Sequence, residues 1–536
     1  MSFQFADLPR LLPELMLILL GVLVIASDVL ERWGTDAKAV AERQHASAQL
    51  AAVSLGLVFV VTLVQSRYLF TVPQPQSDSI TDRLLFFVYN LQQAGPGGQP
   101  LLGAFTTDHL TQVSRLIFLG AGFLVVLLTM GQRSRGNPGE FYGLLLFSTA
   151  GMCLMSGASE LILAFIALEL ASIPQYVLAG FFRDDRRAAE AGMKYFLYGV
   201  FSSAILLYGM SLAYGLVASA QLTSASGGGV IATLFGSIAE AGTASSPLLL
   251  VSVTLIIAGL GYKIAAVPFH SYAPDVYEGA PAAITAFIST ASKTAGFVLL
   301  FRLLTVAFPG AVGSVAWESG WAALILLMAL ATVIGGNLAA LPQQNAKRML
   351  AYSSIGHAGF LLLAFLLWSS PSLGAQAFTT QALLYYLIAY SITNIGAFGA
   401  LAVVAELTGG DNIRDLAGLG RRNAGLATML TVFVLSLAGV PPLAGYWAKF
   451  FVFMAGYRAG AVWLVAVAVV MTVVSLAYYL KLLKAMWFDS PTDETPIMTP
   501  APMNAALVIA LVLVIVLGIF PNAIWPLLAQ AAIAGR

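Results

Sequence analysis

Charge is scarce in this sequence of 536 residues. Lysine, arginine, aspartate and glutamate together make up 10% of the chain, whereas hydrophobic residues make up 59% and the mean hydropathy is +0.86. Basic and acidic residues nearly balance, and the net charge of +1 argues against a nucleic acid or an acidic substrate as partner. This composition is typical of a polytopic membrane protein.

Cysteine is nearly absent as well. The single Cys153 lies in an apolar run, which excludes a disulfide within the chain, a CxxC redox pair and a cysteine-ligated iron–sulfur cluster of its own. Any redox chemistry therefore belongs to partner proteins. A cleavable leader is not visible either, because Asp7, Arg10 and Glu14 stand where a basic leader would be. We expect the first apolar segment to remain in the mature chain.

Long apolar runs are what the sequence has in abundance. Each bilayer-spanning helix needs about 20 mostly apolar residues. We place spans near residues 11–30, 48–66, 109–131, 140–157, 160–182, 195–218, 247–268, 282–303, 320–341, 349–368, 377–405, 425–456, 460–483 and 502–529. The sequence therefore predicts an all-α polytopic membrane protein with fourteen transmembrane helices.

Positive charges are distributed unevenly between the predicted loops. If the amino terminus is outside, sixteen lysines and arginines fall in inside loops, seven fall outside and three remain within spans. The positive-inside rule then places both termini outside. Segments 67–108 and 219–246 are rich in Gly, Ser, Gln and Pro, and we predict that they are outside loops without a folded domain.

Two of the predicted spans, the seventh and the twelfth, contain prolines where a helix should continue. These prolines are Pro268 and the pair Pro441-Pro442. Proline removes a backbone donor and clashes with the preceding turn, so we predict that both helices break. Such breaks at membrane depth need a protein-lined cavity, and a pair of them indicates an internal repeat with its path at the breaks. The register of the repeat stays open, since Lys263 precedes one break and Lys449 follows the other.

Four charged residues stand inside apolar spans: Glu169, Lys263, Lys293 and Lys449. A charge at the bilayer centre costs about 2.5–3.5 kcal/mol on insertion scales, so we interpret these residues as parts of an ion path. A buried carboxylate and a buried ammonium stabilise each other's charged form, and moving one away can release a proton. His357 could relay a proton near neutral pH.

Each of these residues also has a simpler explanation. Glu169 and a lysine could only lock two helices together, and His357 could equally be a packing histidine. At the inside end of the seventh span, His270, Asp275 and Glu278 are expected in a solvated loop or a helix cap.

Several motifs resemble the N subunits of bacterial respiratory complex I, the counterparts of mitochondrial subunit 2 and of the plastid B subunit. They are Gly139 to Gly180, with Ala167-Leu168-Glu169-Leu170; Lys194-Tyr195-Phe196-Leu197; Gly261-Tyr262-Lys263 through Pro268-Phe269-His270; Ala273-Pro274-Asp275-Val276-Tyr277-Glu278-Gly279-Ala280-Pro281; Lys347-Arg348-Met349-Leu350-Ala351-Tyr352-Ser353-Ser354-Ile355; and Pro441 to Phe450. The match covers roughly residues 108–485 and is highly specific.

The resemblance implies one membrane domain over residues 1–536, with two inverted five-helix repeats and broken helices 7 and 12. Its parts are helices one to three (1–131), the first repeat (140–303), the second repeat (320–483) and a carboxyl-terminal helix (502–536). By motif, Glu169 matches the family's fifth-helix glutamate, while Lys263, Lys293 and Lys449 match its seventh-, eighth- and twelfth-helix lysines. His357 lies where related subunits often carry a polar residue. The implied role of these residues is a proton pathway.

The implied activity is proton translocation by a non-redox subunit of an NADH:quinone oxidoreductase, in a bacterial inner (cytoplasmic) membrane. This chain would bind no cofactor or metal, while quinone, FMN and iron–sulfur clusters would lie in partner subunits. Its partners would be other membrane-arm subunits, including other antiporter-like ones, and lipids. Two alternatives stay open: a subunit of a multisubunit cation/proton antiporter, and a structural subunit that only seals the membrane arm.

Overall fold

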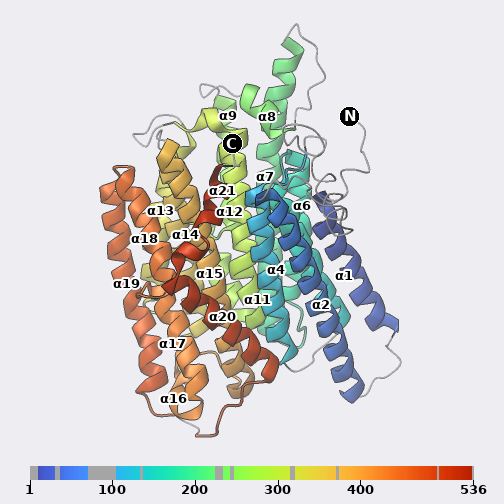
Figure 1. The fold of residues 1–536 in the computed structure, drawn as a ribbon, viewed down its shortest axis with the longest axis vertical. Helices are drawn as coiled ribbons and strands as arrows, with labels where there is room; N and C mark the ends of the chain where they lie inside the picture. Colours follow the sequence, from blue (N-terminus) through green and yellow to red (C-terminus); the bar gives the residue numbers. More distant parts are fainter. Residues whose placement is uncertain are drawn as a thin grey trace, which may run out of the picture.

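Helices dominate the structure, a computed structural model. It describes residues 10–30, 37–70, 104–132, 137–223, 233–241, 247–313, 320–369, 373–491 and 494–533. Apart from three isolated β bridges, these residues contain no strand. The long helices run side by side in one bundle, with α8 (Phe235–Ala241) at one end and α16 (Leu419–Arg422) at the other (Figure 1). The predicted all-α class is confirmed.

Three described helices precede the two predicted repeats. They are α1 (Leu12–Leu30), α2 (Ala37–Phe70) and α4 (His109–Met130), and α2 packs against both of the others. A buried ion pair also joins α4 to α1: Arg115 Nε donates to Glu14 Oε1 at 2.7 Å, and Arg115 Nη2 donates to Glu14 Oε2 at 2.8 Å. This two-point geometry fixes the planar guanidinium against the carboxylate.

The middle of the chain forms α5 (Pro138–Gly157), α6 (Leu161–Ala179), α7 (Arg186–Thr223), α8, α9 (Pro247–Lys263), α10 (Tyr272–Gly279), α11 (Ala282–Phe287), η2 (Ile288–Ser292), α12 (Lys293–Arg302), η3 (Leu303–Ala307) and η4 (Pro309–Ala311). The prediction of a loop over 219–246 is wrong at residues 219–223, where α7 continues, and where α8 lies. This short helix forms because Phe235 and Ile238 are buried on its inner side. The predicted loop 67–108 is helical over residues 67–70, where α2 continues, and residues 71–103 lie outside the described residues.

The last third forms α13 (Trp321–Ala340), α14 (Ala346–Trp368), α15 (Leu373–Thr408), η5 (Ile413–Leu416), α16, α17 (Ala424–Ala438), α18 (Ala444–Arg458), α19 (Val462–Trp487), α20 (Ala501–Ile519), η6 (Pro521–Ala523) and α21 (Trp525–Ile533). The pairs α5–α6 and α13–α14 both pack closely along their lengths. They occupy equivalent places in the two predicted repeats.

The centre of the bundle is formed by α11–α12, α14 and α15. In their most apolar stretches, 100%, 94% and 89% of the residues are buried, against 28% in α19 and 33% in α7. The outer helices instead expose large apolar side chains, such as Phe201 on α7 and Val473 on α19. An apolar rim around a buried centre is the arrangement expected of a protein surrounded by lipid.

Helices cover all fourteen predicted spans within the described residues. Eleven described helices are long and apolar enough to cross a membrane by length and composition, while α9 and α17 are apolar but shorter. The multi-pass membrane class is therefore supported, and the count of fourteen stays a prediction. The orientation also stays a prediction, and Arg32, Arg83, Arg133, Arg135 and Arg536, which enter its charge count, lie outside the described residues.

Both predicted helix breaks are present. Between α9 and α10 the chain makes turns over residues 264–271, and the Val267 amide is satisfied by Thr332 Oγ1 at 2.9 Å. Between α17 and α18 the break begins at Gly439, whose φ of +89° is a left-handed conformation that favours glycine. The Gly445 amide, in the first turn of α18, donates to Ser436 Oγ at 3.1 Å. Polar side chains thus satisfy backbone groups that the breaks release, as the physics of a lipid environment requires.

Candidate functional site

One face of α6 carries three polar side chains, Glu169, Ser172 and Gln175. Their spacing of three residues places them in a row along the helix, with a rise of about 4.5 Å from one to the next. Ser172 and Gln175 are fully buried, and Glu169 is half-buried. The Ser172 hydroxyl donates to the Leu168 carbonyl at 2.6 Å, so its lone pairs remain to accept a hydrogen bond.

Lys263, the last residue of α9, reaches this row with its ammonium. Lys263 Nζ donates to Ser172 Oγ at 2.7 Å and to Gln175 Oε1 at 3.4 Å, and the side chain is buried. The predicted partner Glu169 acts on Lys263 electrostatically. However, these two described residues form no ion pair, and Glu169 Oε1 is buried without a hydrogen-bond partner. The two residues share one site, but neutral groups hold the ammonium.

The Gln175 side chain connects Lys263 to the neighbouring helices. Besides Lys263, its Oε1 accepts from Tyr195 at 3.1 Å and from Ser292 at 2.8 Å. Its Nε2 donates to Ser148 Oγ at 2.9 Å. Ser292 directly precedes Lys293, so Gln175 links the Lys263 site to the segment that carries the next lysine.

Lys293 begins α12, directly after the π-helical turn η2. Its ammonium does not bind the hydroxyls of its own segment; Nζ donates across to the Ser354 carbonyl at 2.9 Å and to Ser354 Oγ at 2.5 Å. Tyr390 on α15 also donates to Ser354 Oγ, at 2.7 Å. π-Helical turns inside α-helices are frequent at functional sites, because they shift the side chains that follow.

His357 lies one turn beyond Ser354 on α14 and is buried. Its Nδ1 is 2.7 Å from the Tyr386 hydroxyl, and its Nε2 is 3.3 Å from the Tyr479 hydroxyl. Its ring centroid lies 6.2 Å from that of Phe360, and the Lys449 ammonium lies over the Phe360 ring. The structure therefore places this histidine between two of the predicted lysines, with a hydroxyl at each ring nitrogen.

Lys449 lies in the second turn of α18 and is buried. Its Nζ donates to the Ala438 carbonyl at 3.0 Å, at the end of α17, so the ammonium caps the broken half-helix. The ammonium also lies 5.2 Å from the centroid of the Phe360 ring. Phe360 follows His357 by three residues, so the face of α14 that begins at Ser354 extends from the Lys293 site to the Lys449 site.

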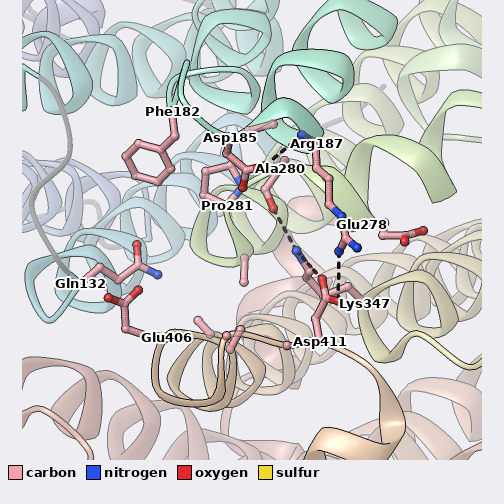
Figure 2. A pocket seen from close by; sticks show the side chains of 17 residues that line it. Gln132, Phe182, Asp185, Arg187, Glu278, Ala280, Pro281, Lys347, Glu406 and Asp411 are labelled. Atoms are coloured by element: carbon pink, nitrogen blue, oxygen red, sulfur yellow. Dashed lines mark hydrogen bonds and ion pairs between the residues drawn. The ribbon is translucent and has the colours of Figure 1, made fainter.

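A pocket of about 290 Å³ opens near α10, at the amino-terminal end of α11. Figure 2 shows Lys347 in this pocket, between the Ala280 carbonyl and Asp411. Lys347 Nζ lies 3.0 Å from Asp411 Oδ2 and donates to the Ala280 carbonyl at 3.3 Å. Glu406 also lines the pocket. The pocket therefore presents charged groups to the end of the helix that leads to Lys293.

Beside this pocket, Asp275 ties α10 to two other helices. Its carboxylate accepts from Lys194 at 2.7 Å and from Arg348 at 2.6 Å, and Arg348 also binds Glu278 at 3.1 Å. The expectation of a solvated loop or a cap is wrong for Asp275 and Glu278, because they lie within α10 and are held by ion pairs. Burial opposes ionisation of Asp275, but the hydrogen bonds and charges of Lys194 and Arg348 outweigh it and hold the carboxyl pKa below its usual value.

His270 lies in the turn between α9 and α10, where the sequence predicted a loop. It is half-buried, and burial lowers the pKa of its imidazole.

Sequence reasoning identified the charged residues of the site but missed their neutral partners. Ser172, Gln175, Ser354 and Tyr390 are ordinary polar residues in apolar helices, and their partners are distant in sequence. One signal was available for α6: the three-residue spacing of Glu169, Ser172 and Gln175 predicts a shared helix face. No comparable signal existed for the pocket residues, whose pairing depends on the tertiary fold.

The described residues contain no group of three or more His, Cys, Asp or Glu side chains that could hold a metal ion. The buried polar groups at and between the lysine sites are lysine, histidine, glutamate, amide and hydroxyl groups. Of these, the lysine, histidine, glutamate and hydroxyl groups bind and transfer protons.

Comparison with known proteins shows which protein family this chain matches. The family model described as "NADH:quinone oxidoreductase/Mrp antiporter, TM" matches residues 158–475. A protein of Roseiflexus castenholzii named NADH-quinone oxidoreductase subunit N 1 is 60% identical, over 99% of both chains. One of Herpetosiphon aurantiacus, named NADH-quinone oxidoreductase subunit N 2, is 44% identical over 99% of both chains.

A solved structure with a similar fold is a chain of respiratory complex I from Thermus thermophilus. Its TM-score is 0.72 at 29% sequence identity, and the alignment covers 96% of this chain and 99% of that chain. The similarity extends across almost all of both chains.

Proposed function

This chain belongs to the NADH:quinone oxidoreductase/Mrp antiporter family, among the N subunits of NADH-quinone oxidoreductases, and from this membership we propose how it works. It is a proton-translocating, antiporter-like subunit in the membrane arm of a complex I-type enzyme. It sits with other membrane-arm subunits, including other antiporter-like ones, and with lipids. Quinone reduction in neighbouring subunits supplies the driving force, and quinone, FMN and iron–sulfur clusters belong to those partners.

The observation that carries this proposal is the line of buried polar groups across the centre of the bundle. It runs from Lys263 through Gln175 and Ser292 to Lys293, and then over the α14 face to Lys449. Three buried ammonium groups in one line carry a large desolvation cost, and such residues in membrane helices mark ion pathways. We assign the proton path to Glu169, Lys263, Lys293, His357 and Lys449.

Within this path, each proton-carrying group has a titratable neighbour, and the neighbour's charge changes when it gains or loses a proton. Glu169 and Lys263 form an electrostatically coupled pair. His357 relays between the Lys293 and Lys449 sites, because it lies on α14 between Ser354, which binds Lys293, and Phe360, which lies under the Lys449 ammonium. Lys449, at the break between α17 and α18, controls the exit half of the path. A change in one charge alters the free energy of protonation at the next group, and this passes protons along the line.

The domain layout that we propose has two inverted five-helix repeats, over residues 140–303 and 320–483. Its support is that each repeat contains one broken helix, α9–α10 in the first and α17–α18 in the second. In each, the buried lysine near the break faces the second helix of its repeat: Lys263 faces α6, and Lys449 faces α14. The helices within residues 1–131 and 502–536 flank these repeats.

We propose that the end of the bundle with the pocket around Lys347 faces the cytoplasm of a bacterium and takes up protons, while both termini lie on the outer side. The excess of lysine and arginine in the predicted inside loops supports this orientation. The pocket's carboxylates and its place at the start of the helix that leads to Lys293 suit proton uptake.

The proposal is tested with the assembled complex in vesicles, by measuring protons pumped per electron transferred to quinone. Lys263→Ala and Lys449→Ala should leave the complex assembled but reduce pumping strongly. Lys449→Arg keeps a charge while losing a readily shifted pKa, so it should also fail as a relay. Normal pumping by the arginine variant would show that Lys449 acts as a fixed charge, and normal pumping by both alanine variants would support a purely structural subunit.

A further inference from the structure

The Lys263 ammonium lies beside three polar groups of α6 but binds only two of them. Ser172 and Gln175 hold it, while Oε1 of Glu169 is buried and unpartnered. All three groups lie on one face of the helix at steps of about 4.5 Å, within the swing of a lysine side chain with four rotatable methylenes. A second position for the ammonium, against Glu169, is thus available on the same row.

The orientation of Ser172 and Gln175 suits them to accept from a cation. The Ser172 hydroxyl proton is committed to the Leu168 carbonyl at 2.6 Å, so the oxygen presents lone pairs to Lys263. The Gln175 amide is oriented by Ser148, which accepts from Nε2 at 2.9 Å while its own hydroxyl donates to the Ala171 carbonyl at 2.9 Å. The carbonyl end of Gln175 therefore faces the lysine.

Gln175 Oε1 has more donors than lone pairs. Lys263, Tyr195 and Ser292 all approach this oxygen, at 3.4, 3.1 and 2.8 Å. A carbonyl oxygen has two lone pairs, so the three donors compete. The longest of the three contacts is that of Lys263, which is also the donor whose side chain lies beside a carboxylate on the same face of α6, that of Glu169.

We propose that Ser172 and Gln175 form a neutral anchor that competes with Glu169 for the Lys263 ammonium. Gln175 then couples the position of the Lys263 ammonium to Ser292, the last residue of the π-helical turn η2, which directly precedes Lys293. This inference rests on the proposed function, in which Lys263 belongs to the proton path. Ser172 and Gln175 are positioning residues, since neither a serine hydroxyl nor an amide carries a proton charge at neutral pH.

The two positions of Lys263 have different consequences for the next site. With the ammonium on the anchor, Ser292 shares the Gln175 oxygen with a cation. With the ammonium on Glu169, Ser292 and Tyr195 take both lone pairs, and the segment before Lys293 is held more firmly. Coupling between two sites requires a structural element with two arrangements. Here the charge at the Lys263 site would favour one arrangement, and the arrangement would change the hydrogen bonding of the segment before Lys293.

The test replaces the anchor without touching any titratable residue. Ser172→Ala and Gln175→Leu each remove an acceptor and keep a similar shape, and Ser172→Thr keeps the hydroxyl. Ser202→Ala is the matched control, because Ser202 donates to the Gly259 carbonyl at 2.8 Å and so joins α7 to α9 without contacting Lys263. All variants are made in the full complex, and assembly is checked by subunit content.

Two measurements decide the question: the position of Lys263 Nζ in an electron cryomicroscopy map of each assembled complex, and protons pumped per electron. In Ser172→Ala and Gln175→Leu, Nζ should move to within ion-pair distance of Glu169. Each of these two variants loses one hydrogen bond from the charged Lys263 ammonium. This loss should shift the ratio of the two Lys263 positions by about ten-fold or more. Pumping should fall several-fold, whereas Ser172→Thr and Ser202→Ala should resemble the unmodified complex.

The inference is overturned if Nζ stays in place in both anchor variants, or if both pump normally while Lys263→Ala does not. Normal pumping by both anchor variants would leave Lys263 on the proton path and refute only the proposed role of Ser172 and Gln175. Normal pumping by Lys263→Ala itself would instead refute the proposed function. The two failures are therefore distinguishable in one set of vesicles.

Discussion

At the scale of single residues, the three buried lysines share one feature: each lies where a helix ends or changes its hydrogen-bonding pattern. Lys263 is the last residue of α9, Lys293 follows η2, and Lys449 binds the last carbonyl of α17. Helix ends leave backbone carbonyls without intrahelical partners, and cations are favourable near a helix carboxyl terminus. Only Lys449 uses such a helix-end carbonyl as its acceptor. Lys263 and Lys293 instead bind neutral oxygens of residues within α6 and α14.

A residue-scale prediction concerns Glu169, the carboxylate that acts on Lys263. Glu169→Ala should remove most pumping while the complex still assembles, because the charged form of Lys263 loses its nearby counter-charge. Glu169→Asp should be milder, since it keeps the charge on a shorter side chain. Pumping per electron and subunit content are measured together. Full pumping in an assembled Glu169→Ala complex would rule out the coupled pair.

At the scale of helices, the two breaks bring the buried lysines to their partners. The break between α17 and α18 depends on Gly439, whose φ is +89° and whose missing side chain leaves room for Lys449. A Cβ atom at this position would lie 3.0 Å from Lys449 Cδ. Backbone conformation and lysine position are therefore linked at one glycine.

Gly439→Ala should destabilise the protein by about 1–2 kcal/mol, the cost of a left-handed conformation for a residue with a Cβ, and should also reduce pumping by displacing Lys449. Gly460→Ala is the matched control, since Gly460 has a φ of +74° and no atom within 4 Å of its missing Cβ. Both variants should lower the thermal midpoint of the purified complex, but only Gly439→Ala should alter protons per electron. Equal pumping by the two variants would contradict this link.

The ion pairs of Asp275, which join α10 to α7 and α14, predict a pH dependence. The folded-state pKa of Asp275 is lowered, so its contribution to stability is present above the unfolded value of about 3.9 and is lost as pH falls through the folded value. Asp275→Asn should cost about 1 kcal/mol or less at pH 7, because the group is partly exposed.

This cost should shrink when thermal unfolding is measured at progressively lower pH, below about pH 4. Glu190→Gln serves as the comparison, because Glu190 binds the same Lys194 at 2.8 Å but is 62% exposed, and its effect should be smaller at every pH. A cost of Asp275→Asn that stays constant with pH would mean that the loss is one of packing.

At the scale of the whole molecule, an apolar bundle is held together at its centre by polar contacts and at its amino-terminal part by a buried ion pair. Glu14 and Arg115 are 1% and 0% exposed and join α1 to α4, and neither is among the residues that we assign to the proton path. Their role is therefore separable from proton transfer.

Glu14→Gln should destabilise the complex by about 3–5 kcal/mol, because it leaves the Arg115 charge buried without its carboxylate. The double variant Glu14→Gln/Arg115→Met should recover much of this loss, since it removes both charges. Thermal unfolding of the purified complex measures both. Protons per electron should be normal in the complexes that remain assembled, and a drop there would place this pair on the proton path.

Much of this protein could be predicted from its sequence. Apolar runs determined where the helices lie, because a membrane helix must satisfy its backbone within one segment, and prolines at 268, 441 and 442 determined where two helices break. The isolated charges identified Glu169, Lys263, Lys293 and Lys449, since an unpaired charge in an apolar run is costly and stands out.

Only the tertiary structure decided what each of these charges touches. Lys263 binds Ser172 and Gln175 instead of Glu169, and Lys293 binds Ser354, which is 61 residues away in the chain. Such partners are ordinary polar residues, and even where their spacing predicts a shared helix face, as for Ser172 and Gln175, the sequence does not say which ammonium lies against that face. Hydropathy records the cost of burying a charge at one position, whereas the oxygens that offset this cost come from whichever helices the fold packs beside it.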